Sequence, residues 1–93
     1  MIVGIMILDM YAEGTHSLKE KRHIVASLRE KIRHKYNISV IESDFQDVWQ
    51  KIQVAVAMVS NTRDMADNVF NQIEDFICLN YPVRIITISK DFV

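Results

Sequence analysis

The sequence is poor in the residues that build covalent and catalytic features. It has two glycines, one proline, one cysteine and three histidines in 93 residues. The single cysteine, Cys78, rules out an internal disulfide, and two glycines cannot form a glycine-rich phosphate loop. The apolar run at residues 2–8 has no basic flank and ends at Asp9, so it is too short for a membrane span and lacks the layout of a signal peptide. We therefore expect a cytoplasmic protein without a membrane partner.

The residue types that usually carry chemistry are isolated from one another. His23 and His34 are eleven residues apart on one predicted helix, about 16 Å along its axis, which is too far to share a metal. His16 precedes that helix and is interpreted as a loop residue rather than a metal ligand. Cys78 has no basic neighbour in the sequence and lies near the apolar side of a predicted helix, so we interpret it as an inert thiol rather than a nucleophile. No cofactor, metal site or catalytic residue is predicted, and we expect the protein not to be an enzyme.

The longest run with helical spacing is Ser17–Lys35, SLKEKRHIVASLREKIRHK. Ser17 can cap the helix, and Glu20 follows at the spacing of a capping box. Apolar residues recur on one side of this helix, at Leu18, Ile24, Val25, Leu28 and Ile32. The segment is therefore predicted to be an amphipathic helix with one face buried.

This helix also holds most of the positive charge. It carries seven Lys/Arg and two Glu, a formal charge of +5, whereas the whole chain carries −1 and the remaining residues therefore −6. The cations follow both flanks of the apolar stripe: Arg22, Arg29 and Arg33 on one flank, Lys31 and Lys35 on the other. Lys21 falls inside the stripe, where we expect its stem to lie on apolar surface while its amine reaches water.

The rest of the chain predicts four strands and a second helix. The strands are expected at residues 2–11, 38–43, 49–59 and 83–90, and the helix runs from the capping residues 60–62 to about Leu79. The order β-α-β-β-α-β is that of a single ferredoxin-like domain over residues 1–93, an α+β fold with a four-stranded antiparallel sheet. Right-handed crossovers would place both helices on one face of the sheet.

The helix-free face is expected to be largely hydrophobic. The strand at residues 2–11 is apolar on both sides, and Ile85 and Ile86 lie in the last strand. An exposed apolar face of this kind usually marks an interaction surface. We therefore expect self-association, or docking of a partner, through this face or through a sheet edge.

The basic helix suggests a second kind of partner. Lysine and arginine at this density can neutralise phosphates independently of nucleotide sequence, and the candidate nucleic-acid-binding residues are Lys19, Lys21, Arg22, Arg29 and Arg33. The alternative is a solvated helix face whose charges offset the acidic remainder of the chain. Trp49, with Gln46 and Asp47, is either a core residue with polar neighbours or the rim of an interface.

Two motifs resemble those of the YlxP-like family of small bacterial proteins. They are SLKEKR at residues 17–22 and QDVWQ at residues 46–50, with YNISV at residues 36–40 between them. The resemblance runs from residue 2 to nearly the end of the chain and implies a ferredoxin-like fold. Phe45 stands where many members have a histidine, so no imidazole role is carried over to that position. The genes of this family tend to lie among those for translation and ribosome-maturation factors, which implies an RNA or ribosome connection but no catalytic residues.

Two hypotheses about function follow. The first is a non-enzymatic protein that docks on ribosomal RNA or a ribonucleoprotein through the basic helix. The second is a homo-oligomer, a dimeric regulatory or ligand-binding module that uses the helix-free sheet face. The two are compatible because the surfaces are on opposite sides of the sheet.

Overall fold

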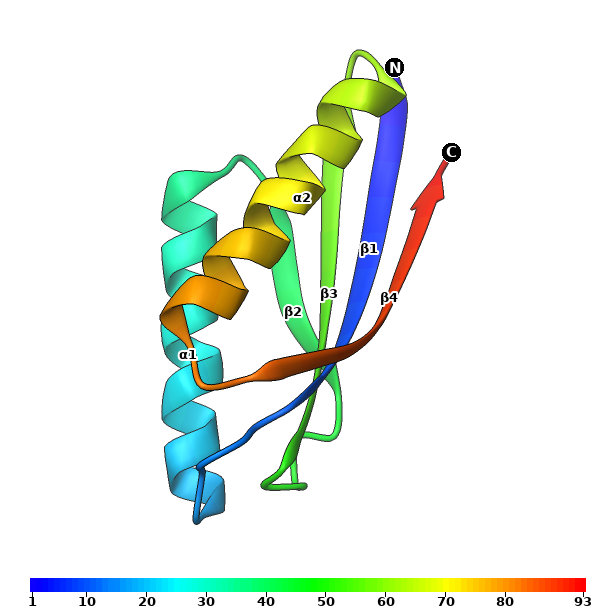
Figure 1. Cartoon of the computed structure of the whole chain (residues 1–93). Coiled ribbons are helices and arrows are strands. Elements are labelled where there is room, and N and C mark those ends of the chain that lie inside the picture. Colours follow the sequence, from blue (N-terminus) through cyan, green and yellow to red (C-terminus); the bar gives the residue numbers. More distant parts are fainter.

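Four strands form one antiparallel sheet, and two helices cover one of its faces (Figure 1). The coordinates are a computed structural model that describes residues 1–93. In chain order the elements are β1 (Ile2–Tyr11), α1 (Leu18–Lys35), β2 (Ser39–Asp44), β3 (Lys51–Ser60), α2 (Arg63–Asn80) and β4 (Arg84–Phe92). The strand order across the sheet is β2-β3-β1-β4. The ferredoxin-like α+β fold predicted from the sequence is confirmed.

The helices begin where the capping residues predict. The Ser17 hydroxyl accepts a hydrogen bond from the Glu20 amide (3.1 Å), and the Glu20 carboxylate accepts one from the His16 amide (2.7 Å). At α2, the Thr62 hydroxyl accepts from the Met65 amide (3.2 Å). These contacts satisfy backbone donors that the first helical turn leaves free.

The core lies between the helices and one side of the sheet. Alternate residues of the two central strands are buried on this side, including Met6, Leu8, Met10, Ile52, Val54 and Val56. Val25, Leu28 and Ile32 of α1, and Phe70, Ile73 and Ile77 of α2, complete the same cluster. Gly4 lets α2 approach closely, because a Cβ at this position would lie 3.0 Å from the Phe70 ring. Neither helix is long and apolar enough to span a bilayer.

The helix-free face is apolar in one part and polar in the rest. Strand register places seven apolar residues together, which we call the apolar patch: Val3, Ile5, Ile7, Ile41, Ala55, Ala57 and Val59. On β4 the side chains directed to this face are Arg84, Thr87, Ser89 and Asp91, whereas Ile85 packs against the core on the helix side. A β-bulge at residue 86 causes this shift of register. The expected hydrophobic face is therefore restricted to β1, β2 and β3.

A row of hydrogen-bonded side chains crosses all four strands next to the apolar patch. The Ser43 hydroxyl donates to Gln53 Oε1 (2.9 Å), and Gln53 Nε2 donates to Asp9 Oδ1 (2.8 Å). The Thr87 hydroxyl donates to the other Asp9 oxygen (2.9 Å). We call this the polar row; its members satisfy one another without a ligand.

Candidate nucleic-acid interface

The cationic residues of α1 divide into two flanks, as the sequence predicts, and the flanks have different surroundings. Arg22 and Arg33 are exposed and Arg29 is half-buried on the side of α1 nearest β2, and Lys19 is exposed in the first turn. Lys19 and Arg33 are 14 residues apart, about 21 Å along the helix. We call these four residues the arginine flank. Its only ion pair is a loose one, between Arg22 Nη2 and Asp47 Oδ1 at 3.5 Å.

The opposite flank of α1 is engaged with the rest of the protein. Lys31 Nζ lies 5.8 Å from the centre of the Tyr81 ring, and Lys35 Nζ lies 4.6 Å from that of Phe76. Ser27 and Tyr81 share a hydrogen bond of 3.0 Å between their hydroxyls. These contacts join α1 to α2 and to the segment that follows it, so this flank serves helix packing.

Lys21 is not available to a partner. Its side chain is completely buried, and its ammonium donates to the backbone carbonyl of Phe45. Nζ also forms an ion pair with Glu42 Oε2 at 3.0 Å, but the angles at the two atoms are unfavourable for a hydrogen bond. The sequence expectation that this amine reaches water is wrong, and Lys21 is removed from the candidate nucleic-acid-binding residues. A buried ammonium needs such partners because an isolated one is strongly disfavoured.

Lys21 joins the two sequence motifs, because it lies in SLKEKR and its partner carbonyl directly precedes QDVWQ. Phe45 has a φ of 62°, a left-handed conformation that is uncommon outside glycine and asparagine. Asp44 Oδ1 accepts from the Phe45 amide (2.7 Å), and the Phe45 carbonyl also accepts from the Val48 amide (3.0 Å). These bonds hold the turn in a conformation that directs its carbonyl to the buried ammonium.

The loop between β2 and β3 carries the predicted interface residues. Gln46 and Asp47 are exposed, and Trp49 retains 39% of its exposure. The Thr15 hydroxyl lies 3.2 Å from the Trp49 carbonyl. Trp49 is therefore neither a core residue nor fully exposed, and its loop is fixed against the segment that leads into α1. Gln46 donates back to the Glu42 carbonyl (3.0 Å).

The second helix has the opposite charge to the first. It carries Asp64, Asp67, Glu74 and Asp75 against Arg63, a formal charge of −3. Lys90 of β4 binds Asp67 (2.9 Å) and lies 3.5 Å from Glu74. Burial lowers the pKa of Lys90, but the hydrogen bond to Asp67 and the charges of Glu74 and Asp67 together raise it above its ordinary value. The helix layer thus has a basic side and an acidic side.

Cys78 lies on the exposed side of α2, away from the core. Burial, followed by the negative charges of Asp75 and Glu74, raises the pKa of its thiol above the ordinary value. A higher pKa lowers the fraction of thiolate, the reactive form, at neutral pH. The location differs from the sequence interpretation, but the thiol is in a setting that disfavours nucleophilic chemistry.

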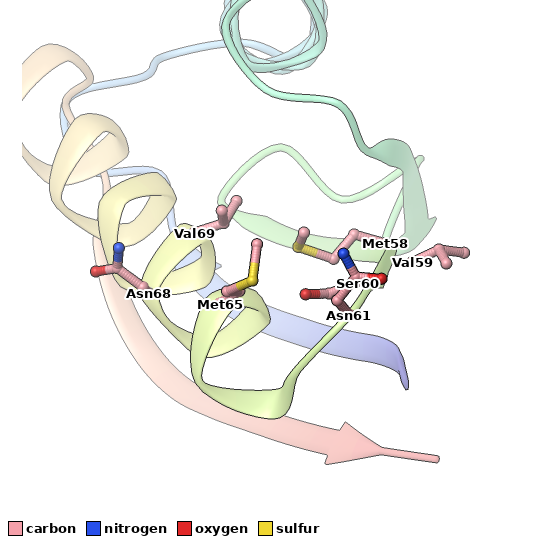
Figure 2. A pocket seen from close by; sticks show the side chains of 7 residues that line it. All are labelled: Met58, Val59, Ser60, Asn61, Met65, Asn68 and Val69. Atoms are coloured by element: carbon pink, nitrogen blue, oxygen red, sulfur yellow. The ribbon is translucent and has the colours of Figure 1, made fainter. Parts of the chain in front are cut away.

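A shallow hollow of about 380 Å³ lies where β3 leads into α2. Figure 2 shows Met58 reaching toward Val69 and Met65, while Val59 points away to the helix-free face. Ser60, Asn61 and Asn68 complete its lining, so no charged side chain enters it. Its chemistry suits an apolar contact rather than a phosphate.

Solved structures support the fold assignment alone. The chain superposes on part of a VAO-type flavoprotein from Myceliophthora thermophila C1 with a TM-score of 0.59 and 11% identity, covering 99% of this chain and 16% of that one. It also superposes on the de novo designed protein Foldit4 with a TM-score of 0.54 and 9% identity, covering 100% and 97% of the two chains. Because the chain spans only 16% of the flavoprotein and identities are this low, neither likeness bears on activity.

Sequence comparison identifies the family. The uncharacterized protein YlxP of Bacillus subtilis (strain 168) is 33% identical over 76 residues, which cover 82% of this chain and 83% of that protein. The family model described as protein of unknown function (DUF503) matches residues 3–90. The resemblance carried by SLKEKR and QDVWQ is confirmed, and the chain belongs to this family of uncharacterised proteins.

Proposed function

We propose that this is a non-enzymatic cytoplasmic protein that docks on structured RNA, either ribosomal RNA or a ribonucleoprotein, through the arginine flank. The proposal rests on the cations of α1 that have no acidic partner within the chain. Lys19, Arg29 and Arg33 have no carboxylate partner within ion-pair distance, and Arg22 has only the loose contact with Asp47. Unpaired cations in a row along one helix are the feature that phosphate groups recognise without regard to base sequence.

The acidic helix limits how an RNA can approach. The carboxylates of α2 repel phosphates, whereas the arginine flank is on the other side of α1, next to the edge strand β2. A bound RNA would therefore contact α1 and the β2 side of the molecule.

Trp49 lies in the loop that Arg22 contacts through Asp47, so an aromatic surface is near one end of the arginine flank. A partly exposed indole can stack on an unpaired base, as aromatic residues do in many RNA-binding proteins. It is the only tryptophan in the chain, so its fluorescence reports on this loop without labelling.

The test is the affinity for ribosomal RNA across a salt series. We expect log K to fall linearly with log salt, with a slope that corresponds to three or four phosphate contacts. The double variant Arg22→Ala/Arg33→Ala should reduce the magnitude of that slope by about 1.4 to 1.8, since each lost contact accounts for about 0.7 to 0.9. The fluorescence of Trp49 should change on binding.

The control is Lys51→Ala/Arg63→Ala, which removes the same charge from positions outside α1. If this control weakens binding as much as the flank variant does, the attraction is one of net charge and the flank has no special role. Affinity that does not respond to salt would reject docking through phosphates altogether.

A further inference from the structure

The helix-free face combines a projecting side chain and a hollow at neighbouring positions. Ile41 of β2 is 56% exposed, and it borders a hollow of about 220 Å³ over the small residues Ala55 and Ala57. Ile5, Ser39, Val40 and Val56 complete the lining of this hollow, which is almost wholly apolar. A two-fold axis pairs identical surfaces, so such an interface needs each projecting group to have its receptor on the same face. The apolar patch meets this requirement.

The polar row next to the patch has its hydrogen bonds made before any partner arrives, so only the negative charge of Asp9 opposes burial. Both Asp9 oxygens and the Gln53 side chain are already hydrogen-bonded within the row. Polar groups are costly to bury when they lose water without gaining a partner, and these have partners before any contact is made. A second surface can therefore cover them without leaving unpaired groups.

Charge is distributed unequally along the strands of this face. Lys51 and Arg84 flank Tyr11 at one end of β1, where Arg84 is paired with Glu13 (2.9 Å) and Lys51 has no acidic partner, and Asp91 pairs with Ile5 toward the other end. When two copies pack with their strands reversed, the acidic end of each lies toward the basic end of the other. This arrangement is favourable, whereas a parallel arrangement would juxtapose like charges.

The size of the face is sufficient for a specific contact. The central strands have 10 residues each, so the face measures about 33 Å along the strands and about 19 Å across four of them. Because β2 has only 6 residues, the usable area is roughly 500 Å² on each copy, or about 1,000 Å² for the pair. This total reaches the lower limit for specific protein interfaces.

We propose that the helix-free face binds a second copy of this chain, in a two-fold dimer with reversed strands in which Ile41 of each copy fills the hollow over Ala55 and Ala57 of the other. The occupant is this chain itself because the projecting group, the receptor and the complementary charged ends are all on one surface. The arginine flanks remain on the outside of the dimer, so the proposal is independent of RNA docking.

The test is sedimentation of the intact protein over a range of concentrations. The wild-type chain should sediment with twice its 10.8 kDa mass at tens of micromolar. Ile41→Asp and Val59→Asp each place a charge in the patch and should raise the dissociation constant at least tenfold. Both side chains are more than half exposed in the single chain, so these changes should leave the fold intact, as circular dichroism can verify.

The matched control is Leu79→Asp, which introduces the same charge at an exposed residue of α2 on the opposite side. It should leave the dissociation constant unchanged. Sedimentation of the wild type as a monomer at about 1 mM would overturn the proposal. The dissociation constant would then exceed about 1 mM, which corresponds to a free energy of association weaker than about 4 kcal/mol. A dimer that survives both patch variants would also overturn it, since the copies would then meet elsewhere.

Discussion

The ammonium of Lys21 lies 3.0 Å from Glu42 Oε2, with the lysine side chain fully buried and the glutamate 14% exposed. The same ammonium donates to the carbonyl of Phe45, so one side chain ties α1 to β2 and to the turn that follows it. This contact gives a physical reason for the two motifs to occur together in one sequence. The lysine of SLKEKR holds the turn that presents QDVWQ.

Replacing Lys21 with methionine should destabilise the protein by about 3 kcal/mol. The change leaves Glu42 partly buried without its cation and leaves the Phe45 carbonyl without its ammonium donor. Urea denaturation measures the loss. Lys19→Met, two residues earlier at an exposed position, should change stability by less than about 0.5 kcal/mol.

Combining Lys21→Met with Glu42→Gln separates the ion pair from packing. If the two charges stabilise each other, the double variant should lose less unfolding free energy than the two single variants lose in total. Each single change leaves one charge without its partner, whereas the double change removes both charges. Strict additivity would show that the two groups do not interact in solution.

Lys90 should make stability fall at alkaline pH. Its pKa in the folded protein is raised above 10.5, its ordinary value, so its stabilising effect is fully present below that pH and is lost as pH rises through the higher folded value. Thermal unfolding of the wild type and of Lys90→Met, compared between pH 9 and pH 11.5, measures the effect. The difference in stability between them should shrink as pH rises. A constant difference would mean that Lys90 contributes through packing of its stem alone.

Gly4→Ala should destabilise the protein by about 1 kcal/mol. The new methyl group would lie 3.0 Å from the Phe70 ring and 3.3 Å from the Ala66 side chain, so α2 must shift by a few tenths of an ångström. Chemical denaturation measures the loss. Adding Phe70→Leu makes room for the methyl group, so the double variant should lose less than the two single losses combined.

Asp9→Asn should lower the free energy of unfolding by about 1 to 2 kcal/mol, because it disrupts the polar row. The carboxylate accepts from Gln53 on one side and from Thr87 on the other, and an amide can accept from only one of them. If the new carbonyl accepts from Gln53, the new amino group faces the Thr87 hydroxyl, which must then accept instead of donating to a carboxylate. Val3→Thr, on the same strand and face but outside the row, is the control and should have a smaller effect on the denaturation midpoint.

The fold could be predicted from the sequence because its signals are local. Alternating apolar residues marked the strands, 3.6-residue spacing marked the helices, and Ser17 and the capping residues 60–62, of which Thr62 is the cap, marked where the helices begin. The order of elements then left few topologies open. The remaining differences are a residue or two at the strand ends.

The surroundings of Lys21 could not be predicted from the same signals. Its position within the apolar stripe was visible, but a lysine there is ordinarily expected to extend its amine to water. Burial of the Lys21 ammonium depends on oxygens of Glu42 and Phe45, more than twenty residues along the chain. It also depends on the left-handed φ of Phe45, which no turn motif in the sequence predicts. The polar row is similar. Asp9 stood out in an apolar strand, but its partners depend on strand register and on the bulges at residues 43 and 86.

The opposite charges of α1 and α2 have a consequence for a chain whose net charge is only −1. Such a molecule has little attraction to a polyanion when averaged over all its orientations, yet it has a large electric dipole across its helix layer. In the field of a polyanion it rotates before contact, which raises the fraction of productive encounters at low ionic strength. The same dipole predicts that the protein is retained by both cation-exchange and anion-exchange resins near its isoelectric point of about 6.3. The cation exchanger would bind the side of α1, and the anion exchanger the side of α2.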